Sequence, residues 1–177
     1  IPTFAEKPDA EVLYWVGCAA AFDERNRKVA RAFARCLNAA GVRFAILGQE
    51  ESCTGDPARR MGNEYVYQIL AGGNIETLNR YGMAERTIVT ACPHCFNTIA
   101  NEYGQLGGNF KIVHHSVFLQ ELLGSGRLRT ASADESTGPA RSITFHDSCY
   151  MARYNNVIAA PRDVLGSVAG VELREME

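Results

Sequence analysis

Short apolar stretches alternate with longer amphipathic stretches along this chain. The apolar stretches are rich in β-branched and aromatic residues, which is typical of buried strands. We expect strands over Val12–Val16, Val42–Leu47, Arg86–Ala91, Phe110–His114 and Ser142–His146, and a last one from Val171.

Between these strands, apolar residues recur at the spacing of a helix that buries one face. Asp56 is expected to cap the second helix, with Pro57 at its first position and a hesitation at Gly72 and Gly73. We expect helices over Asp23–Ala40, Asp56–Tyr81, Pro93 to about Tyr103, His115–Leu123 and about Pro161–Val168. Alternating strands and helices predict a Rossmann-like α/β fold, with a mostly parallel sheet and helices on both faces.

Most of the cysteines follow directly after predicted strands. These are Cys18, Cys53, Cys92, Cys95 and Cys149. In a parallel sheet the carboxyl ends of the strands meet at one edge, where ligands bind. The sixth, Cys36, falls within a predicted helix and is interpreted as a small packing residue. The sequence therefore predicts that thiols converge at one edge of one sheet.

Cys92 and Cys95 stand three positions apart, at the end of a predicted strand and in the first turn of a helix. The free N–H groups of a helix start favour negative charge and lower the pKa of a thiol. A pair with this spacing, taken alone, serves as a metal ligand pair, as a redox dithiol, or arises by chance. With Cys18 and Cys53 the pair gives four thiols, which suit a cubane iron–sulfur cluster or a closed tetrahedral zinc site.

Composition narrows the function classes. The chain has 177 residues, 46% of them hydrophobic, and a net charge of −2. No basic run or basic stripe is present, so nucleic acid is not an expected partner. Six cysteines at wide, uneven spacing indicate a reducing compartment, with thiols used for metal or redox chemistry. Neither a GxSxG nor a GxGxxG motif is found, and Gly17-Cys-Ala-Ala follows the first strand, so a hydrolase or a dinucleotide domain lacks support.

Other polar residues near the thiols each have two interpretations. His94 bonds a cluster sulfur or is a solvated turn residue, and His115 lines the site or caps its own helix. Arg59 and Arg60 balance an anionic cluster or form a solvated helix face. His114 and His146 are expected to be packing residues, and Asp147 orients a neighbour or caps a turn.

The chain also contains an internal repeat. Cys18 is followed by a helix and then by Gly41-Val42, 23 positions after the cysteine, and Cys149 by a helix and then by Gly170-Val171, 21 positions after it. We expect a first unit over residues 1–129, a linker over 130–140, and over 141–177 the start of a second unit that is cut short. Cys149 is a fifth ligand of the first site or the first ligand of a second site. Because the chain begins at Ile1, we expect a piece of a longer protein.

The order Cys18, Cys53-Thr54-Gly55, Cys92-Pro-His-Cys95 resembles the cysteine-rich CCG domain. That domain occurs twice in one of the subunits of heterodisulfide reductase and in the iron–sulfur subunits of glycolate oxidase and its relatives. The segments Cys53–Arg60, Cys92–Asn97 and His146–Tyr150 are similar to membrane-linked Fe–S oxidoreductases that are paired with electron-transfer flavoprotein.

The resemblance implies an iron–sulfur cluster, expected to be of the 4Fe–4S type, with Cys18, Cys53, Cys92 and Cys95 as its ligands. Zinc is the alternative metal. Thr54 stands where the family's five-cysteine motif has another cysteine, which favours an ordinary four-cysteine cluster over the noncubane form. The implied function is electron relay between a flavoprotein and a quinone or similar acceptor. The ferredoxin-like, membrane and second CCG parts would lie elsewhere in the full-length protein, at the cytoplasmic face of the membrane. A structural zinc module and a thiol–disulfide enzyme using Cys92 and Cys95 remain alternatives.

Overall fold

The computed structural model describes residues 1–131 and 141–176. The chain forms two compact units, Ile1–His115 and Ser116–Glu177, which are described separately below. The predicted linker, residues 130–140, lies almost wholly outside the described residues.

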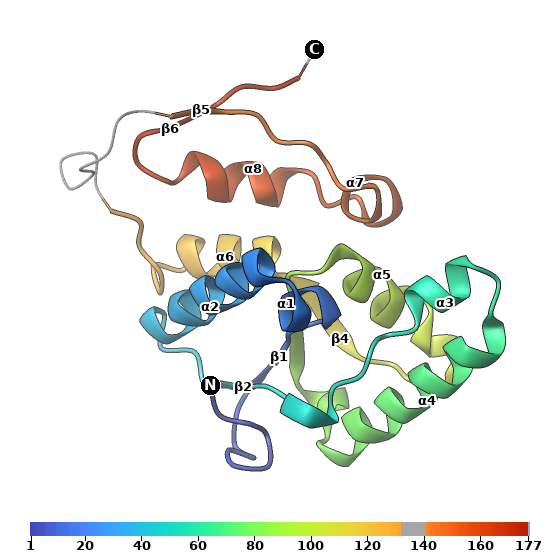
Figure 1. Ribbon diagram of the computed structural model, residues 1–177. Helices are drawn as coiled ribbons and strands as arrows, with labels where there is room; N and C mark the ends of the chain where they lie inside the picture. Colours follow the sequence, from blue (N-terminus) through green and yellow to red (C-terminus); the bar gives the residue numbers. More distant parts are fainter. Residues whose placement is uncertain (132–140, 177) are drawn as a thin grey trace. The chain divides into compact units, whose positions relative to one another are not determined.

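A four-stranded parallel sheet forms the centre of the first unit (Figure 1). Its strands are β1 (Val12–Trp15), β2 (Phe44–Ala45), β3 (Thr87–Thr90) and β4 (Lys111–His114), in the order β2-β1-β3-β4. All three strand pairs are parallel, so the prediction of a parallel, Rossmann-like sheet is confirmed. The chain moves from β1 to one side to form β2 and returns past β1 to form β3. The topological switch point therefore lies between β1 and β3.

Helices cover the two faces of this sheet (Figure 1). On one face lies α2 (Glu24–Ala39), and on the other lie α4 (Glu64–Arg80) and α5 (Pro93–Asn101). Asp23 caps α2 by accepting the N–H of Asn26 at 2.8 Å. Burial on both faces explains the unbroken apolar sequence of β1, in which Leu13, Tyr14 and Trp15 are completely buried.

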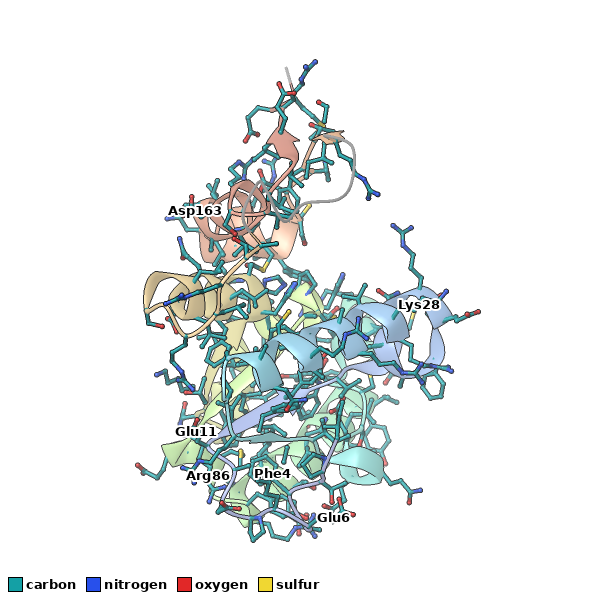
Figure 2. The ribbon with its side chains drawn as sticks, turned by 90° about the vertical axis from the view of Figure 1, so that its left-hand side faces the viewer. Phe4, Glu6, Glu11, Lys28, Arg86 and Asp163 are labelled. Carbon is teal, nitrogen blue, oxygen red and sulfur yellow. The ribbon has the colours of Figure 1, made fainter. Side chains whose placement is uncertain are left out.

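The amino-terminal segment extends the edge of the sheet beyond β2. Pro2 accepts the N–H of Ile46 at 3.0 Å, and the N–H of Phe4 donates to the Ile46 carbonyl at 2.9 Å. Arg86 lies beside the Phe4 ring, 5.5 Å from its centroid (Figure 2). Strand β2 is therefore shorter than the strand predicted over Val42–Leu47. Beyond Ala45, Ile46 pairs with Thr3 of the amino-terminal segment and not with β1.

One helix was not predicted, and one predicted helix is wrong. A short helix, α1 (Cys18–Phe22), precedes α2, where no helix was expected. The helix expected over Asp56–Tyr81 is two helices, α3 (Asp56–Arg60) and α4. Gly62 adopts a φ of 81° and breaks the helix, and the Asn63 side chain then caps α4 by accepting the Val66 N–H at 3.1 Å.

The predicted cap of this helix is also corrected. Gly55, with a φ of 87°, takes the N-cap position of α3, and Asp56 is the first helical residue. Asp56 is buried and its side chain turns to other partners. Pro57 does lie in the first turn. The remaining elements of this unit are short 3-10 turns at η1 (Gly48–Glu50), η2 (Met83–Glu85) and η3 (Tyr103–Leu106).

The second unit contains a two-stranded parallel sheet of β5 (Arg141–Ile143) and β6 (Val171–Leu173). Its helices are α6 (His115–Gly124), which starts at the last residue of the first unit, α7 (Cys149–Asn155) and α8 (Ala159–Gly166). Asp147 forms a two-pronged ion pair with Arg162, at 2.8 and 2.9 Å, so it orients a neighbour as one interpretation proposed.

The internal repeat is present in the secondary structure. In both segments a strand leads to a short helix that begins at a cysteine, Cys18 in α1 and Cys149 in α7. A second helix follows, then a glycine with positive φ, Gly41 or Gly170, then a strand parallel to the first. Over the part of the chain that the structure describes, no helix is both long and apolar enough to cross a membrane.

Two adjacent histidines, His114 and His115, lie at the carboxyl end of β4. His114 donates from Nε2 to the Ala91 carbonyl at 3.2 Å, and its ring meets that of His115 edge to face. Burial lowers the pKa of His114 to about 3, helped by the neighbouring His115. Burial likewise lowers the pKa of His115 to about 4. Both rings are therefore neutral packing groups at neutral pH, as expected for His114.

We predict that the first unit loses stability as the pH falls from about 6.5, the pKa of an unfolded histidine, towards 4. In this window the unfolded chain binds protons that the folded chain does not. Each histidine then removes up to about 1.4 kcal/mol of unfolding free energy per pH unit. Urea unfolding followed by the fluorescence of Trp15 measures this slope. His115→Gln should flatten it, and His146→Gln, at an exposed position, should not; equal slopes in all three proteins would refute the assignment.

Candidate functional site

Four cysteines lie at the carboxyl edge of the first sheet, around its switch point. Cys18 starts α1 three residues after the end of β1, and Cys53 lies between η1 and α3, beyond the end of β2. Cys92 is the N-cap of α5 after β3, and Cys95 is in the first turn of that helix. Three strand ends thus supply these four thiols, as the sequence predicted. The prediction is wrong for Cys149, which was expected at the same edge but follows β5 of the separate two-stranded sheet.

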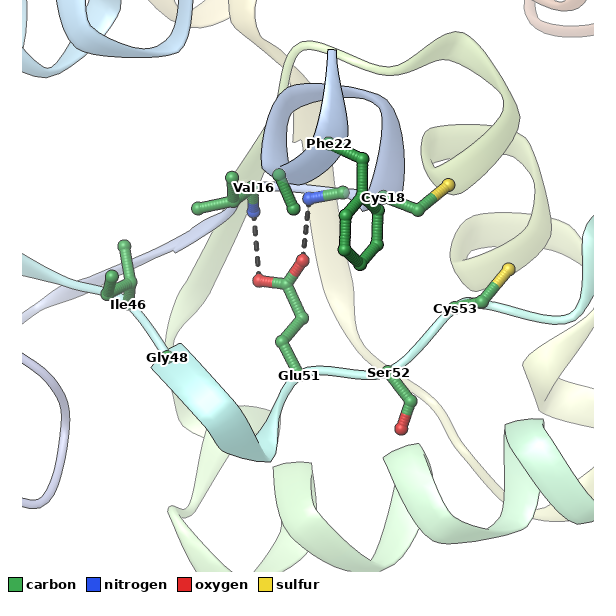
Figure 3. Close-up of a pocket in the computed structure, with 10 residues that line it drawn as sticks. Val16, Cys18, Phe22, Ile46, Gly48, Glu51, Ser52 and Cys53 are labelled. Carbon is green, nitrogen blue, oxygen red and sulfur yellow. Dashed lines mark hydrogen bonds between the residues drawn. The ribbon is translucent and has the colours of Figure 1, made fainter. Parts of the chain in front are cut away.

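Contacts among these residues show that they converge. A Cβ placed on Gly17 would lie 3.6 Å from the Cys95 sulfur and 3.7 Å from the Cys92 Cβ, so the turn before α1 packs against the Cys92–Cys95 pair. Burial raises the pKa of the Cys18 thiol, and the charges of Cys53 and Cys92 raise it further. Figure 3 shows the sulfurs of Cys18 and Cys53 pointing the same way.

The Cys92 thiol is prepared for deprotonation. A hydrogen bond from Cys95 and the backbone N–H groups of Cys95 and His94 lower the pKa of Cys92 to about 6, against the effect of burial. Cys95 is the other half of this pair, and its hydrogen bond to Cys92 and its burial raise its pKa well above the usual value. One thiolate is therefore available at neutral pH, and thiolate is the form that binds metal.

The Cys53-Thr54-Gly55 segment is fixed by buried polar groups. Asn74, completely buried in α4, donates to the Cys53 carbonyl at 2.9 Å and to the Tyr103 hydroxyl at 3.1 Å. Tyr103 in turn donates to the Thr54 carbonyl at 3.2 Å. Sequence reasoning missed both residues, although Asn74 is the one polar position in the buried stripe of α4, Tyr67, Ala71, Asn74 and Leu78, and this irregularity is a usable signal.

Thr54 and Gly55 have different structural roles in this segment. The buried Thr54 hydroxyl donates a weak hydrogen bond to the Cys95 sulfur at 4.0 Å. Gly55 packs on Tyr67: a Cβ there would lie 2.9 Å from the ring and 3.2 Å from the Tyr67 carbonyl oxygen. Because Gly55 also has a φ of 87°, any other residue is strained at this position.

Glu51 joins the ends of β1 and β2. Its two carboxyl oxygens accept the N–H groups of Val16 at 2.9 Å and of Gly17 at 2.6 Å (Figure 3). Burial raises the pKa of Glu51 to about 7, against the opposing effect of these two hydrogen bonds. Nothing in the local sequence distinguishes Glu51 from its neighbour Glu50, and this residue was also missed.

The polar residues of α3 and α5 near Cys95 are paired with one another. His94 Nδ1 lies 2.8 Å from the buried Asp56 carboxylate, and the His94 side chain is 60% exposed in the first turn of α5. His94 is therefore a solvated residue that has a carboxylate partner, and a bond to a cluster sulfur stays a prediction. Arg59 and Arg60 both bind Glu102, at 2.7 and 2.6 Å. These arginines therefore form an ion-pair group with Glu102, in which the side chain of Arg59 is 21% and that of Arg60 44% exposed. That they balance the charge of a cluster stays a prediction.

The remaining predicted residues are placed as follows. Cys36 lies within α2, as expected for a packing residue. Cys149 is exposed at the start of α7 in the second unit. His115 packs edge to face on Phe33 and lines a hollow that Cys92 and Pro93 also line. Over residues 1–131 and 141–176, no three His, Cys, Asp or Glu side chains have the spacing that holds a single metal ion.

A family model described as a cysteine-rich domain (CCG) matches residues 12–100 and 143–177. The chain therefore belongs to the cysteine-rich CCG domain family, which confirms the resemblance seen in the sequence.

Several curated proteins are similar to this chain along nearly its whole length. It is 43% identical to EtfAB:quinone oxidoreductase of Syntrophomonas wolfei, over 94% of this chain and 22% of that protein. It is 43% identical to the probable iron-sulfur-binding oxidoreductase FadF of Bacillus subtilis, over 100% of this chain and 25% of that protein. It is 44% identical to a probable membrane-anchored ferredoxin of Chromohalobacter salexigens, over 100% of this chain and 26% of that protein. The chain thus spans about a quarter of the length of these relatives. No solved structure matches it.

We predict that Asn74→Ala destabilises the first unit by about 1–3 kcal/mol, because it leaves the Cys53 carbonyl and the Tyr103 hydroxyl without this buried donor. It should also lower the amount of metal retained, since the Cys53 segment loses its anchor. Asn79→Ala, at an exposed position of the same helix, is the matched control. Urea unfolding and metal analysis give the two readouts; a variant that behaves like Asn79→Ala would contradict the anchoring role.

Proposed function

We propose that this chain is the iron–sulfur cluster-binding, electron-transfer part of a larger oxidoreductase. The observation that carries the proposal is the convergence of four thiols from three strand ends at the switch point of the sheet. Four cysteines are the donor set of 4Fe–4S clusters, and a bound cluster supplies a one-electron redox centre.

The residues present fit such a group. Cys18, Cys53, Cys92 and Cys95 are the proposed ligands, and the low pKa of Cys92 provides a first thiolate. At the fifth position of the family motif stands Thr54, whose hydroxyl faces the Cys95 sulfur. A hydroxyl that donates to a ligand sulfur stabilises its negative charge, which favours a four-cysteine 4Fe–4S cluster with Thr54 as a hydrogen-bond donor.

Cys149 is proposed as the first ligand of a second site. It begins α7 as Cys18 begins α1, within the same order of strand, two helices, glycine and strand. The predicted units, 1–129 and 141–177, follow from this repeat. The further ligands of the second site would come from sequence beyond this chain.

The proposed electron donor is an electron-transfer flavoprotein, and the proposed acceptor is a quinone or a similar compound. These assignments rest on the name EtfAB:quinone oxidoreductase of a relative 43% identical. We further propose a position at the cytoplasmic face of a membrane for the full-length protein; the name of another relative, a probable membrane-anchored ferredoxin, supports the association with a membrane. Ferredoxin-like and membrane parts would then belong to the same longer protein.

A redox dithiol is a second candidate, because one feature of the site favours it. Cys92 and Cys95 form a hydrogen-bonded pair in which one thiol has a low pKa and the other a high pKa. This is the arrangement in which a thiolate attacks a disulfide and its partner resolves the product. Such an enzyme needs only these two cysteines.

We predict that serine substitution of Cys18, Cys53, Cys92 or Cys95, one at a time, lowers iron and sulfide content below half that of the parent chain, whereas Cys36→Ser, within α2, leaves both unchanged. Iron, sulfide and zinc are measured on anaerobically purified protein. One zinc atom per chain without sulfide would show that the site is a structural zinc site and holds no cluster. Disulfide reductase activity that survives Cys18→Ser in metal-free protein would establish the dithiol enzyme.

A further inference from the structure

A hollow of about 440 Å³ lies next to the thiol site (Figure 3). It is bounded by the end of β1, by α1, and by the segment from Ile46 to Cys53. The hollow falls within the range of ligand pockets, which hold about 300–1,000 Å³. Cys18 and Cys53 form part of its wall, so anything bound in it lies beside two of the proposed cluster ligands.

The lining of this hollow is mainly apolar, with side chains from Val16, Ala21, Phe22 and Ile46. Phe22 is 85% exposed although it is a large aromatic residue. Its ring extends between Glu51 and Cys18 (Figure 3). A flat apolar ligand would cover this ring and remove its surface from water, which favours binding.

The charges of the lining limit the class of ligand. The lining has one carboxyl group, that of Glu51, and both of its oxygens already accept backbone N–H groups. None of the ten lining residues, all in the described part of the chain, is basic, and the guanidinium of nearby Arg27 is turned to the Ala21 carbonyl. Phosphorylated or otherwise anionic ligands find no counter-charge among these lining residues and would face the carboxyl group of Glu51. A neutral ring is therefore favoured over a flavin nucleotide.

We infer that this hollow, lined by Val16, Ala21, Phe22 and Ile46 beside Cys18 and Cys53, binds the neutral ring of a quinone. The inference rests on the proposed function and assigns a place to the proposed acceptor. Conversion of the quinone to the quinol would take up two electrons and two protons. Oxidation of the reduced flavoprotein would supply the electrons, a cluster held by Cys18, Cys53, Cys92 and Cys95 would pass them on one at a time, and water would supply the protons.

The test is a titration of anaerobically purified, oxidised chain with duroquinone, whose ring carbons are all substituted and do not add thiols. Trp15 is the only tryptophan and directly precedes Val16, so its fluorescence reports on the hollow. We expect saturable quenching. Phe22→Glu, which puts a charge on the wall at an exposed position, should raise the Kd at least about tenfold. Tyr65→Glu, at an aromatic residue on α4 that is 76% exposed, should keep the Kd of the parent.

Each other outcome overturns one statement. If the iron-loaded protein shows no saturable quenching, the quinone site is overturned and the cluster proposal stands. The same holds if Phe22→Glu and Tyr65→Glu bind duroquinone with the same Kd. Riboflavin 5′-phosphate that binds as tightly as duroquinone overturns the assignment in favour of a flavin. Protein that binds duroquinone but holds no iron or sulfide contradicts the proposed function itself.

Discussion

The parallel pairing of β1 with β3 is the constraint on which the thiol site depends. The register places Trp15 beside Thr90, so the chain leaves both strands at the same level and in the same direction. From there one segment continues into α1 with Cys18 and the other into α5 with Cys92 and Cys95. Helices that diverge to opposite faces at a switch point leave space between the strand ends, and the thiols occupy the borders of this space. A cluster of thiols so formed needs no disulfide and no loop folded specially for it.

Sheet topology alone does not fix the sulfur positions, and buried polar groups supply the rest. Glu51 ties the end of β1 to the segment after β2, and Asn74 with Tyr103 holds the main chain at Cys53 and Thr54. These hydrogen bonds are partly or wholly buried, so breaking one of them leaves a partner that water replaces only in part. Glu51 also lines the apolar hollow, together with Cys18 and Cys53. One edge of the sheet thus carries both a redox-capable donor set and an adjacent ligand pocket.

Much of this arrangement follows from the sequence because it depends on periodic patterns. The strands at Val12, Arg86 and Phe110 have apolar runs with clear ends, and each cysteine after a strand is placed by topology. Local departures from these patterns were not predicted. Gly62 and Asn63 split a long helical pattern through a positive φ and a side-chain cap, and Gly55 displaced Asp56 from the cap position. The partners of Glu51 and Asn74 lie 21 to 35 residues away in sequence, where no local pattern reports them.

The central claim, that four cysteines of the first unit hold an iron–sulfur cluster, is tested most directly by iron K-edge X-ray absorption of anaerobically purified chain. The account predicts a first shell made of sulfur alone together with iron–iron scattering, as in a polynuclear cluster held by thiolates. A spectrum with nitrogen or oxygen ligands and without iron–iron scattering, or a protein that carries zinc in place of iron, would contradict it.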